Sequence, residues 1–203
     1  MELSRVGADL FGVADAAVLR TLAIQGRAVS GREIARLAEL NQSSARRALL
    51  RWVETGLVSA TTSSHATLYT INRAHLLWPP IEAVLAAPSR LEREIAALVE
   101  AHAADGTTAA IFGSVARRDS TASSDVDIVL VSPDDADPSQ REGLVDDLRA
   151  LVSSSTGNDA HLVDVTRRQL QDMVAQGDPL AAAWSAEART VAGPDLVRAI
   201  ASA

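Results

Sequence analysis

The apolar run IVLV, residues 128–131, begins directly after two aspartates that stand one residue apart, Asp125 and Asp127. A short run of β-branched and apolar residues is typical of a buried strand, in which every second side chain points to the same face. Two carboxylates brought within ~4 Å of each other repel by about 4 kcal/mol at an effective dielectric of 20. The pattern therefore predicts a bound cation where this strand enters the core.

The segment before these aspartates predicts a second ligand group. Residues 107–112, TTAAIF, are typical of another short strand, and Gly113 and Ser114 end it with a turn. A glycine in such a turn lets backbone N–H groups approach an anion closely. Because the neighbouring candidate ligands carry oxygen, with neither Cys nor His nearby, magnesium or manganese is favoured over zinc.

The stretch GSVARRDSTASSDVDIVLV, residues 113–131, resembles the nucleotidyltransferase signature of the DNA polymerase β superfamily. It is most similar to that of the minimal nucleotidyltransferases, G-S-x-A-R-G-x-x-x-x-x-S-D-x-D. The resemblance covers roughly residues 90–200 and implies an α/β domain with a mixed sheet over residues 90–203. It also implies that Asp125 and Asp127 are catalytic metal ligands, and that Gly113, Ser114 and Arg117 bind the triphosphate of a nucleoside triphosphate.

The family's third carboxylate lies on a later strand. Asp164, flanked by Val163 and Val165, is the expected third catalytic and metal-binding residue, with Asp159 in the turn TGND as the alternative. One position departs from the family pattern, since Arg118 stands where glycine is common. If that position has a positive φ, arginine there costs roughly 1 kcal/mol or more.

The first 78 residues predict three helices and a hairpin. The helices are expected over residues 15–26, 30–40 and 41–56, with Ser30 as the N-cap of the second, and the hairpin over residues 57–72. This order resembles bacterial winged helix-turn-helix regulators over residues 13–78, which implies that the third helix enters the major groove of double-stranded DNA. The side chains expected to contact DNA are Gln42, Ser43, Arg46, Arg47, Arg51 and His65.

Charge differs between the two halves of the chain. Residues 1–78 hold nine arginines and six acidic residues, whereas the remainder holds ten arginines and twenty acidic residues. A basic first half suits a DNA-binding domain, but a module with so few cations would bind weakly, so we expect a homodimer on DNA.

The whole sequence predicts an α+β protein of two domains. A winged helix-turn-helix domain spans residues 1–78, a linker with Pro79 and Pro80 spans 79–89, and the nucleotidyltransferase domain spans 90–203. The chain has no cysteine, and neither an apolar leader nor a run of roughly 18 apolar residues is present. We therefore expect a cytoplasmic protein without membrane contact.

Two functions remain open from the sequence. In the first, the protein is a magnesium- or manganese-dependent enzyme that moves a nucleoside monophosphate from a nucleoside triphosphate to a hydroxyl of a protein or RNA, and also binds DNA. In the second, it is a DNA-binding transcriptional regulator or antitoxin. Its transferase-like domain would then be non-catalytic and sense nucleotide or bind a partner toxin.

Overall fold

A computed structural model describes residues 1–62 and 66–202 of the chain. It divides into two compact units, one formed by Arg5–Ala87 and the other by Met1–Ser4 together with Pro88–Ala203. We call these the N-terminal unit and the C-terminal unit. Within the described residues, no helix is long and apolar enough to span a membrane.

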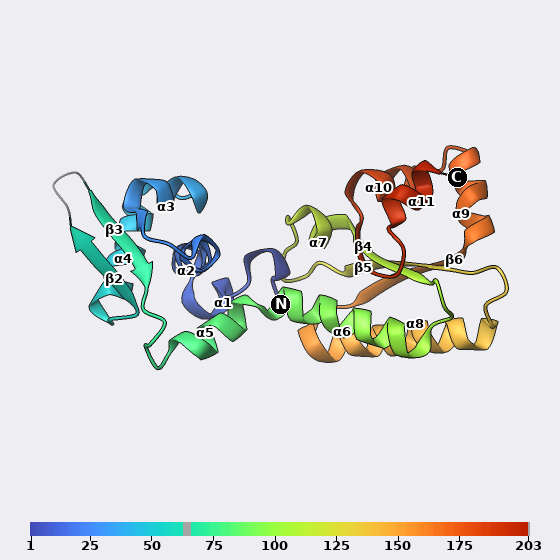
Figure 1. The fold of residues 1–203 in the computed structure, drawn as a ribbon, viewed down its shortest axis with the longest axis horizontal. Helices are drawn as coiled ribbons and strands as arrows, with labels where there is room; N and C mark the ends of the chain where they lie inside the picture. The colour runs from blue at the N-terminus through green and yellow to red at the C-terminus, as the bar shows by residue number, and fades with distance from the viewer. Residues whose placement is uncertain (63–65, 203) are drawn as a thin grey trace. The chain divides into compact units, whose positions relative to one another are not determined.

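The N-terminal unit combines helices with a three-stranded antiparallel sheet (Figure 1). Its elements are α1 (Ala8–Phe11), α2 (Val13–Gln25), β1 (Val29–Ser30), α3 (Gly31–Leu37), α4 (Gln42–Glu54), β2 (Val58–Thr62), β3 (Thr67–Ile71) and α5 (Trp78–Leu85). The sheet has the order β1-β3-β2. The three helices and the hairpin expected from the sequence are present, and Ser30 accepts a hydrogen bond from the Glu33 backbone N–H, as expected of an N-cap.

The segment predicted as a linker, residues 79–89, contains most of the helix α5, which belongs to the N-terminal unit. Pro79 and Pro80 lie in the first turn of α5, where a proline needs no N–H partner and its fixed φ suits the helix. Trp78 and Ile81 are buried in the core of this unit, against residues such as Leu22 and Leu57. Proline interrupts a helix when it lies in the interior, but Pro79 and Pro80 lie in the first turn, where they are compatible with α5.

The C-terminal unit has a four-stranded mixed sheet with helices on both faces (Figure 1). Its elements are α6 (Ala87–His102), β4 (Thr108–Phe112), α7 (Gly113–Arg117), β5 (Val126–Ser132), α8 (Pro138–Thr156), β6 (Ala160–Thr166), α9 (Arg167–Ala175), α10 (Pro179–Glu187), β7 (Arg189–Ala192) and α11 (Leu196–Ala201). The strand order is β6-β5-β4-β7, in which β5 and β6 are parallel and the other pairs antiparallel. The mixed sheet predicted from the sequence is thus confirmed.

Alternate residues of β5, an inner strand of the sheet, belong to two different hydrophobic cores, one on each face of the sheet. Ile128 and Leu130 pack with residues of α6 and α8 on one face, whereas Val129 and Val131 pack with residues of α9, α10 and α11 on the other. Asp127 belongs to the second set by the two-residue period of a strand. The face that carries Asp127 is therefore the face covered by α9, α10 and α11.

Candidate active site and candidate nucleic-acid interface

Asp125 and Asp127 lie where the sequence analysis expects them, at the start of β5. Asp125 is exposed and immediately precedes the strand, and the side chain of Asp127 is 24% exposed. Asp127 pairs with Phe112 of β4 on one side and with His161 of β6 on the other. Asp127 thus lies at the end of the sheet where β4, β5 and β6 are paired side by side.

Gly113 places the turn after β4 directly against the carboxylate of Asp127. Its φ is +67°, and a Cβ at this position would lie 2.2 Å from Asp127 Oδ2. Only glycine fits this approach, because any side chain would both clash with the carboxylate and strain the backbone. The turn expected to bind an anion and the carboxylate expected to bind a cation are therefore neighbours.

Ser114 and Arg117 follow Gly113 in the short helix α7. The Arg117 guanidinium donates to Glu187 Oε2 at 2.7 Å and to Asp119 Oδ2 at 3.2 Å. These hydrogen bonds, above all the one to Glu187, hold the pKa of Arg117 above its usual value, with the charges of the same two carboxylates adding to the effect. The structure thus brings together the three residues predicted to bind phosphate.

Glu187, the last residue of α10, is a part of this site that sequence reasoning missed. Its Oε1 accepts a hydrogen bond from the Gly113 backbone N–H at 3.0 Å, and its Oε2 accepts from Arg117. Glu187 is 74 positions from Gly113 in the chain. A glutamate at a helix end carries no local signal for such a contact, so the pairing depends on how α10 packs.

His161 is the second residue that sequence reasoning missed. It pairs with Asp127 across β5 and β6, and its Nδ1 lies 3.1 Å from Asp127 Oδ1. The imidazole is 59% exposed. The residue of β6 that lies beside the aspartate pair is therefore a histidine and not a carboxylate.

Asp164, the expected third carboxylate, does not join the other two. It pairs with Leu130, three residues beyond Asp127, and residues three apart in a strand point to opposite faces. Its carboxylate forms two contacts with Arg141 of α8, at 2.9 and 3.3 Å. This geometry contradicts the predicted position of Asp164, because the register of β5 and β6 turns it toward α8.

Asp159, the alternative, lies nearer to the aspartate pair in the backbone. Its carbonyl oxygen accepts a hydrogen bond from the Val126 N–H at 2.9 Å, and the residue is exposed. Among the residues that the structure describes, no three His, Cys, Asp or Glu side chains are gathered as a metal site. Two neighbouring aspartates nevertheless fit one magnesium ion, which proteins commonly hold by one or two carboxylates together with substrate phosphates.

Arg118 ends α7 in the left-handed conformation, with a φ of +66°. The positive φ considered from the sequence is therefore present, and an arginine there costs roughly 1 kcal/mol or more relative to glycine. The following loop is held in place by Ser120, which is buried. Ser120 N–H donates to Ser4 Oγ at 2.9 Å, and the Ser4 N–H donates to Ser120 Oγ at 3.2 Å.

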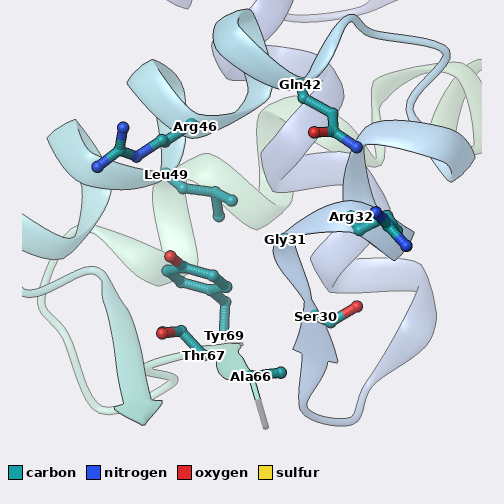
Figure 2. Close-up of a pocket in the computed structure, with 9 residues that line it drawn as sticks. All are labelled: Ser30, Gly31, Arg32, Gln42, Arg46, Leu49, Ala66, Thr67 and Tyr69. Carbon is teal, nitrogen blue, oxygen red and sulfur yellow. The ribbon is translucent and has the colours of Figure 1, made fainter.

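The N-terminal unit has an open groove between α3, α4 and β3 (Figure 2). Its volume is about 620 Å³, and the described residues that line it include two arginines and no acidic residue. The lining residues labelled in Figure 2 include Arg32, Gln42, Arg46 and Tyr69. Gln42 and Arg46, two of the residues predicted to contact DNA, therefore border a basic groove.

The other predicted DNA contacts differ from one another. Arg47 is exposed on α4 and donates to Ser44 Oγ at 3.2 Å, whereas the Ser43 hydroxyl donates to Asn41 Oδ1 at 2.7 Å. Arg51 forms an ion pair with Asp15, a buried residue of α2. The guanidinium of Arg51 therefore has a partner within its own unit, and its side chain is 55% exposed. His65 lies outside the described residues.

Comparison with known proteins supports the assignment of the second half of the chain. Residues 90–172 match the model of the nucleotidyltransferase domain family. This match supports the nucleotidyltransferase domain that the Gly-Ser turn and the aspartate pair predict for this segment. No curated protein matches the chain.

Two solved structures are similar to part of the chain. One is a toxin–antitoxin crystallised with AMP-PNP, with 20% sequence identity and a TM-score of 0.36, and the similarity covers 55% of this chain and 85% of that chain. The other is a mutant of the toxin–antitoxin MntA-HpeT, with 18% identity and a TM-score of 0.35, covering 55% of this chain and 84% of that chain.

Proposed function

We propose that the nucleotidyltransferase domain is a magnesium-dependent enzyme that transfers a nucleoside monophosphate from a nucleoside triphosphate to a hydroxyl of a protein or an RNA. One observation carries this proposal. The backbone of Gly113 lies so close to Asp127 Oδ2 that a Cβ would be 2.2 Å from it. A turn suited to phosphate and an aspartate pair suited to a divalent cation thus form one site, as transfer of a nucleotide requires.

Each residue of the site has a part in the proposed reaction. Asp125 and Asp127 would hold the magnesium ion that accompanies the triphosphate, and the ion would neutralise charge on the phosphate oxygens. Ser114 and Arg117 would orient the triphosphate from α7. The acceptor hydroxyl would lose its proton to solvent as its oxygen forms a bond to the α-phosphorus, the bond from the α-phosphorus to the bridging oxygen would break, and pyrophosphate would leave. Asp164 has no part in this scheme, because it is paired with Arg141.

For the N-terminal unit we propose a winged helix-turn-helix that binds double-stranded DNA through α4. The groove beside α4 supports this, since Arg32 and Arg46 line it and no acidic residue does so among the described residues. Gln42, Arg46 and Arg47 are exposed and have suitable chemistry for base edges and phosphates. Because so few cations would give weak binding, we propose that two copies of the chain bind DNA together.

A second candidate function is supported by the contacts within the site. Glu187 accepts hydrogen bonds from both Gly113 and Arg117, and His161 lies beside Asp127 in place of a carboxylate. A site occupied in this way could serve nucleotide sensing or the binding of a partner toxin without catalysis. The chain would then be a DNA-binding regulator or antitoxin.

Labelling with α-phosphate-labelled nucleoside triphosphates separates the two candidates. With magnesium, the wild-type protein should transfer label to itself, to RNA or to a partner protein, and Asp127→Ala should abolish the transfer. Asp146→Ala is a matched control, because Asp146 is an exposed residue of α8 that pairs only with Arg149 among the described residues. Equal labelling by the wild type and Asp127→Ala would refute the enzymatic function and leave the second candidate.

A gel-shift titration with the protein's own promoter DNA tests the proposed DNA binding. Arg47→Ala should weaken specific binding roughly tenfold, since it removes a cation from the exposed face of α4. Arg90→Ala removes the same charge from the C-terminal unit, where Arg90 pairs with Glu94, and should leave binding unchanged. Absence of specific binding at low salt would show that the N-terminal unit serves another kind of partner.

A further inference from the structure

Glu187 contacts two of the groups that the proposed function assigns to the nucleotide phosphates. Its Oε1 accepts from the Gly113 backbone N–H at 3.0 Å, and its Oε2 accepts from the Arg117 guanidinium at 2.7 Å. Both donors would serve equally well for two oxygens of a phosphate group, because carboxylate and phosphate oxygens accept the same charge-assisted hydrogen bonds. A carboxylate of the chain itself therefore occupies this end of the site.

We infer that the Glu187 carboxylate competes with the triphosphate of a nucleotide for the Gly113 N–H and the Arg117 guanidinium. This competition sets how tightly the site binds phosphate. This inference rests on the proposed function, since it takes Gly113 and Arg117 as phosphate-binding groups. When a triphosphate binds, the Glu187 carboxylate leaves these donors and phosphate oxygens replace it. The affinity that is measured for nucleotide is then reduced by the stability of the Glu187 contacts.

The position of Glu187 is determined by the packing of α10 on β4. Trp184, one helical turn before Glu187, is completely buried, and its ring meets the ring of Phe112 edge-on with the centroids 5.9 Å apart. Phe112 directly precedes Gly113 in the chain. Because the helix end is anchored in this way, release of the carboxylate requires rotation of the Glu187 side chain and not displacement of α10. The side chain is 19% exposed, so it borders solvent.

The charges around Gly113 favour competition over shared binding. The Asp127 carboxylate lies against the Cα side of Gly113, and the Glu187 carboxylate lies at its N–H. A triphosphate in this place would add further negative charge beside two carboxylates, and like charges a few ångströms apart repel. The two positive charges of the magnesium ion proposed at Asp127 would be shared by the aspartates and the phosphates, and the Arg117 guanidinium that pairs with Glu187 would have to be shared with the phosphates as well. Loss of the Glu187 charge should therefore strengthen phosphate binding.

Isothermal titration with two phosphate probes tests this inference in the full chain. The probes are ATP and inorganic triphosphate, each with magnesium, and inorganic triphosphate reports on the phosphate groups without a base. Glu187→Gln keeps the size of the side chain and removes its charge, so both probes should bind roughly fivefold more tightly, or more, than to the wild type. Glu92→Gln is the matched control, since Glu92 pairs with Arg189 on the other face of the sheet, and its affinity should equal that of the wild type.

A second variant guards against a folding defect in the first. Glu187→Asp keeps the charge but is one methylene shorter, so its carboxylate cannot reach both the Gly113 N–H and the Arg117 guanidinium. It should bind both probes more tightly than the wild type but less tightly than Glu187→Gln, because its contacts are weakened while its charge remains. A thermal melt of each variant then shows whether Glu187 merely stabilises the turn.

The outcomes separate this inference from the function on which it rests. If Glu187 positions the turn for phosphate, both variants will bind the probes more weakly or equally, and the inference is overturned while nucleotide binding stands. If a variant binds and the wild type does not, competition is complete and the inference is supported. If none of the proteins binds either probe, the phosphate site itself is refuted, and the proposed function falls together with the inference.

Discussion

Replacing Gly113 by alanine should damage the candidate active site more than an ordinary glycine substitution. Two effects act at this position. The residue has a φ of +67°, and a Cβ would stand 2.2 Å from Asp127 Oδ2, a separation at which the carboxylate must move. The substitution thus perturbs both the turn that precedes α7 and the residue proposed to hold magnesium.

The expected cost follows from these two effects. An alanine in the left-handed region costs roughly 1–2 kcal/mol. Forcing a methyl group into an occupied position costs about 1–3 kcal/mol more. Gly113→Ala should therefore lower the free energy of unfolding of the C-terminal unit by about 2–5 kcal/mol. Because Asp127 has to shift, magnesium-dependent binding of ATP should weaken as well.

Two other glycines of the same unit allow these effects to be separated. Gly157 ends α8 with a φ of +73°, and a Cβ there would have no heavy atom of the described residues within 4 Å, so Gly157→Ala should show the backbone cost alone. Gly143 lies inside α8 with equally open space and no positive φ, so Gly143→Ala should stabilise the unit by about 1 kcal/mol.

Urea titration read by hydrogen exchange of the β4 and β5 peptides measures the stability of the C-terminal unit by itself. The difference between Gly113→Ala and Gly157→Ala gives the cost of displacing Asp127. If the two variants are equally stable, the Asp127 carboxylate moves aside without cost, and the predicted steric effect of a side chain at position 113 is refuted.

Three further predictions concern single residues of the C-terminal unit. Asp164→Asn should leave nucleotide transfer within about twofold of the wild type. Because the substitution weakens the partly buried pair with Arg141, it should lower the unfolding free energy by roughly 1 kcal/mol in urea titration. A complete loss of transfer would restore the catalytic role of Asp164. His161→Ala should lower magnesium-dependent transfer roughly tenfold by removing the partner of a proposed metal ligand, with an unchanged melting temperature, as measured by labelling and calorimetry. The pKa of Asp134 lies below its usual value, mainly because its carboxylate accepts a hydrogen bond from the backbone N–H of Arg168. The stability that this hydrogen bond contributes is present above about pH 4 and is lost as the pH falls through the lowered pKa. Asp134→Asn should accordingly flatten the acid limb of a stability–pH profile of the unit, and an unchanged limb would contradict this.

Local patterns in the sequence were sufficient for much of the fold. The amphipathic helices of the N-terminal unit, the Ser30 cap and the two strands on either side of the Gly113 turn all follow from the spacing of neighbouring residues. The positive φ considered at Arg118 is likewise a local property of the turn. Such features depend on interactions within a few residues, which is why a single sequence reveals them.

Contacts between distant segments account for the arrangements that the sequence did not predict. Asp164 was expected beside the aspartate pair, but the register of two parallel strands places His161 there. A shift of one residue in register exchanges the two faces of a strand, and nothing local to β6 specifies that register. Arg51 pairs with Asp15, which lies 36 positions earlier on another helix, and no local pattern indicates this pairing.

The amino-acid sequence by itself indicated where the candidate phosphate-binding turn and the candidate metal-binding aspartates stand in this chain, because both patterns lie within residues 113–127. Only the tertiary structure decided which side chains surround them. Glu187 reaches the Gly113 N–H because a buried Trp184 anchors α10 beside β4, and His161 reaches Asp127 because β5 and β6 pair in one register. Packing and strand pairing bring together residues far apart in the chain, and these long-range contacts leave no periodic signal in the sequence.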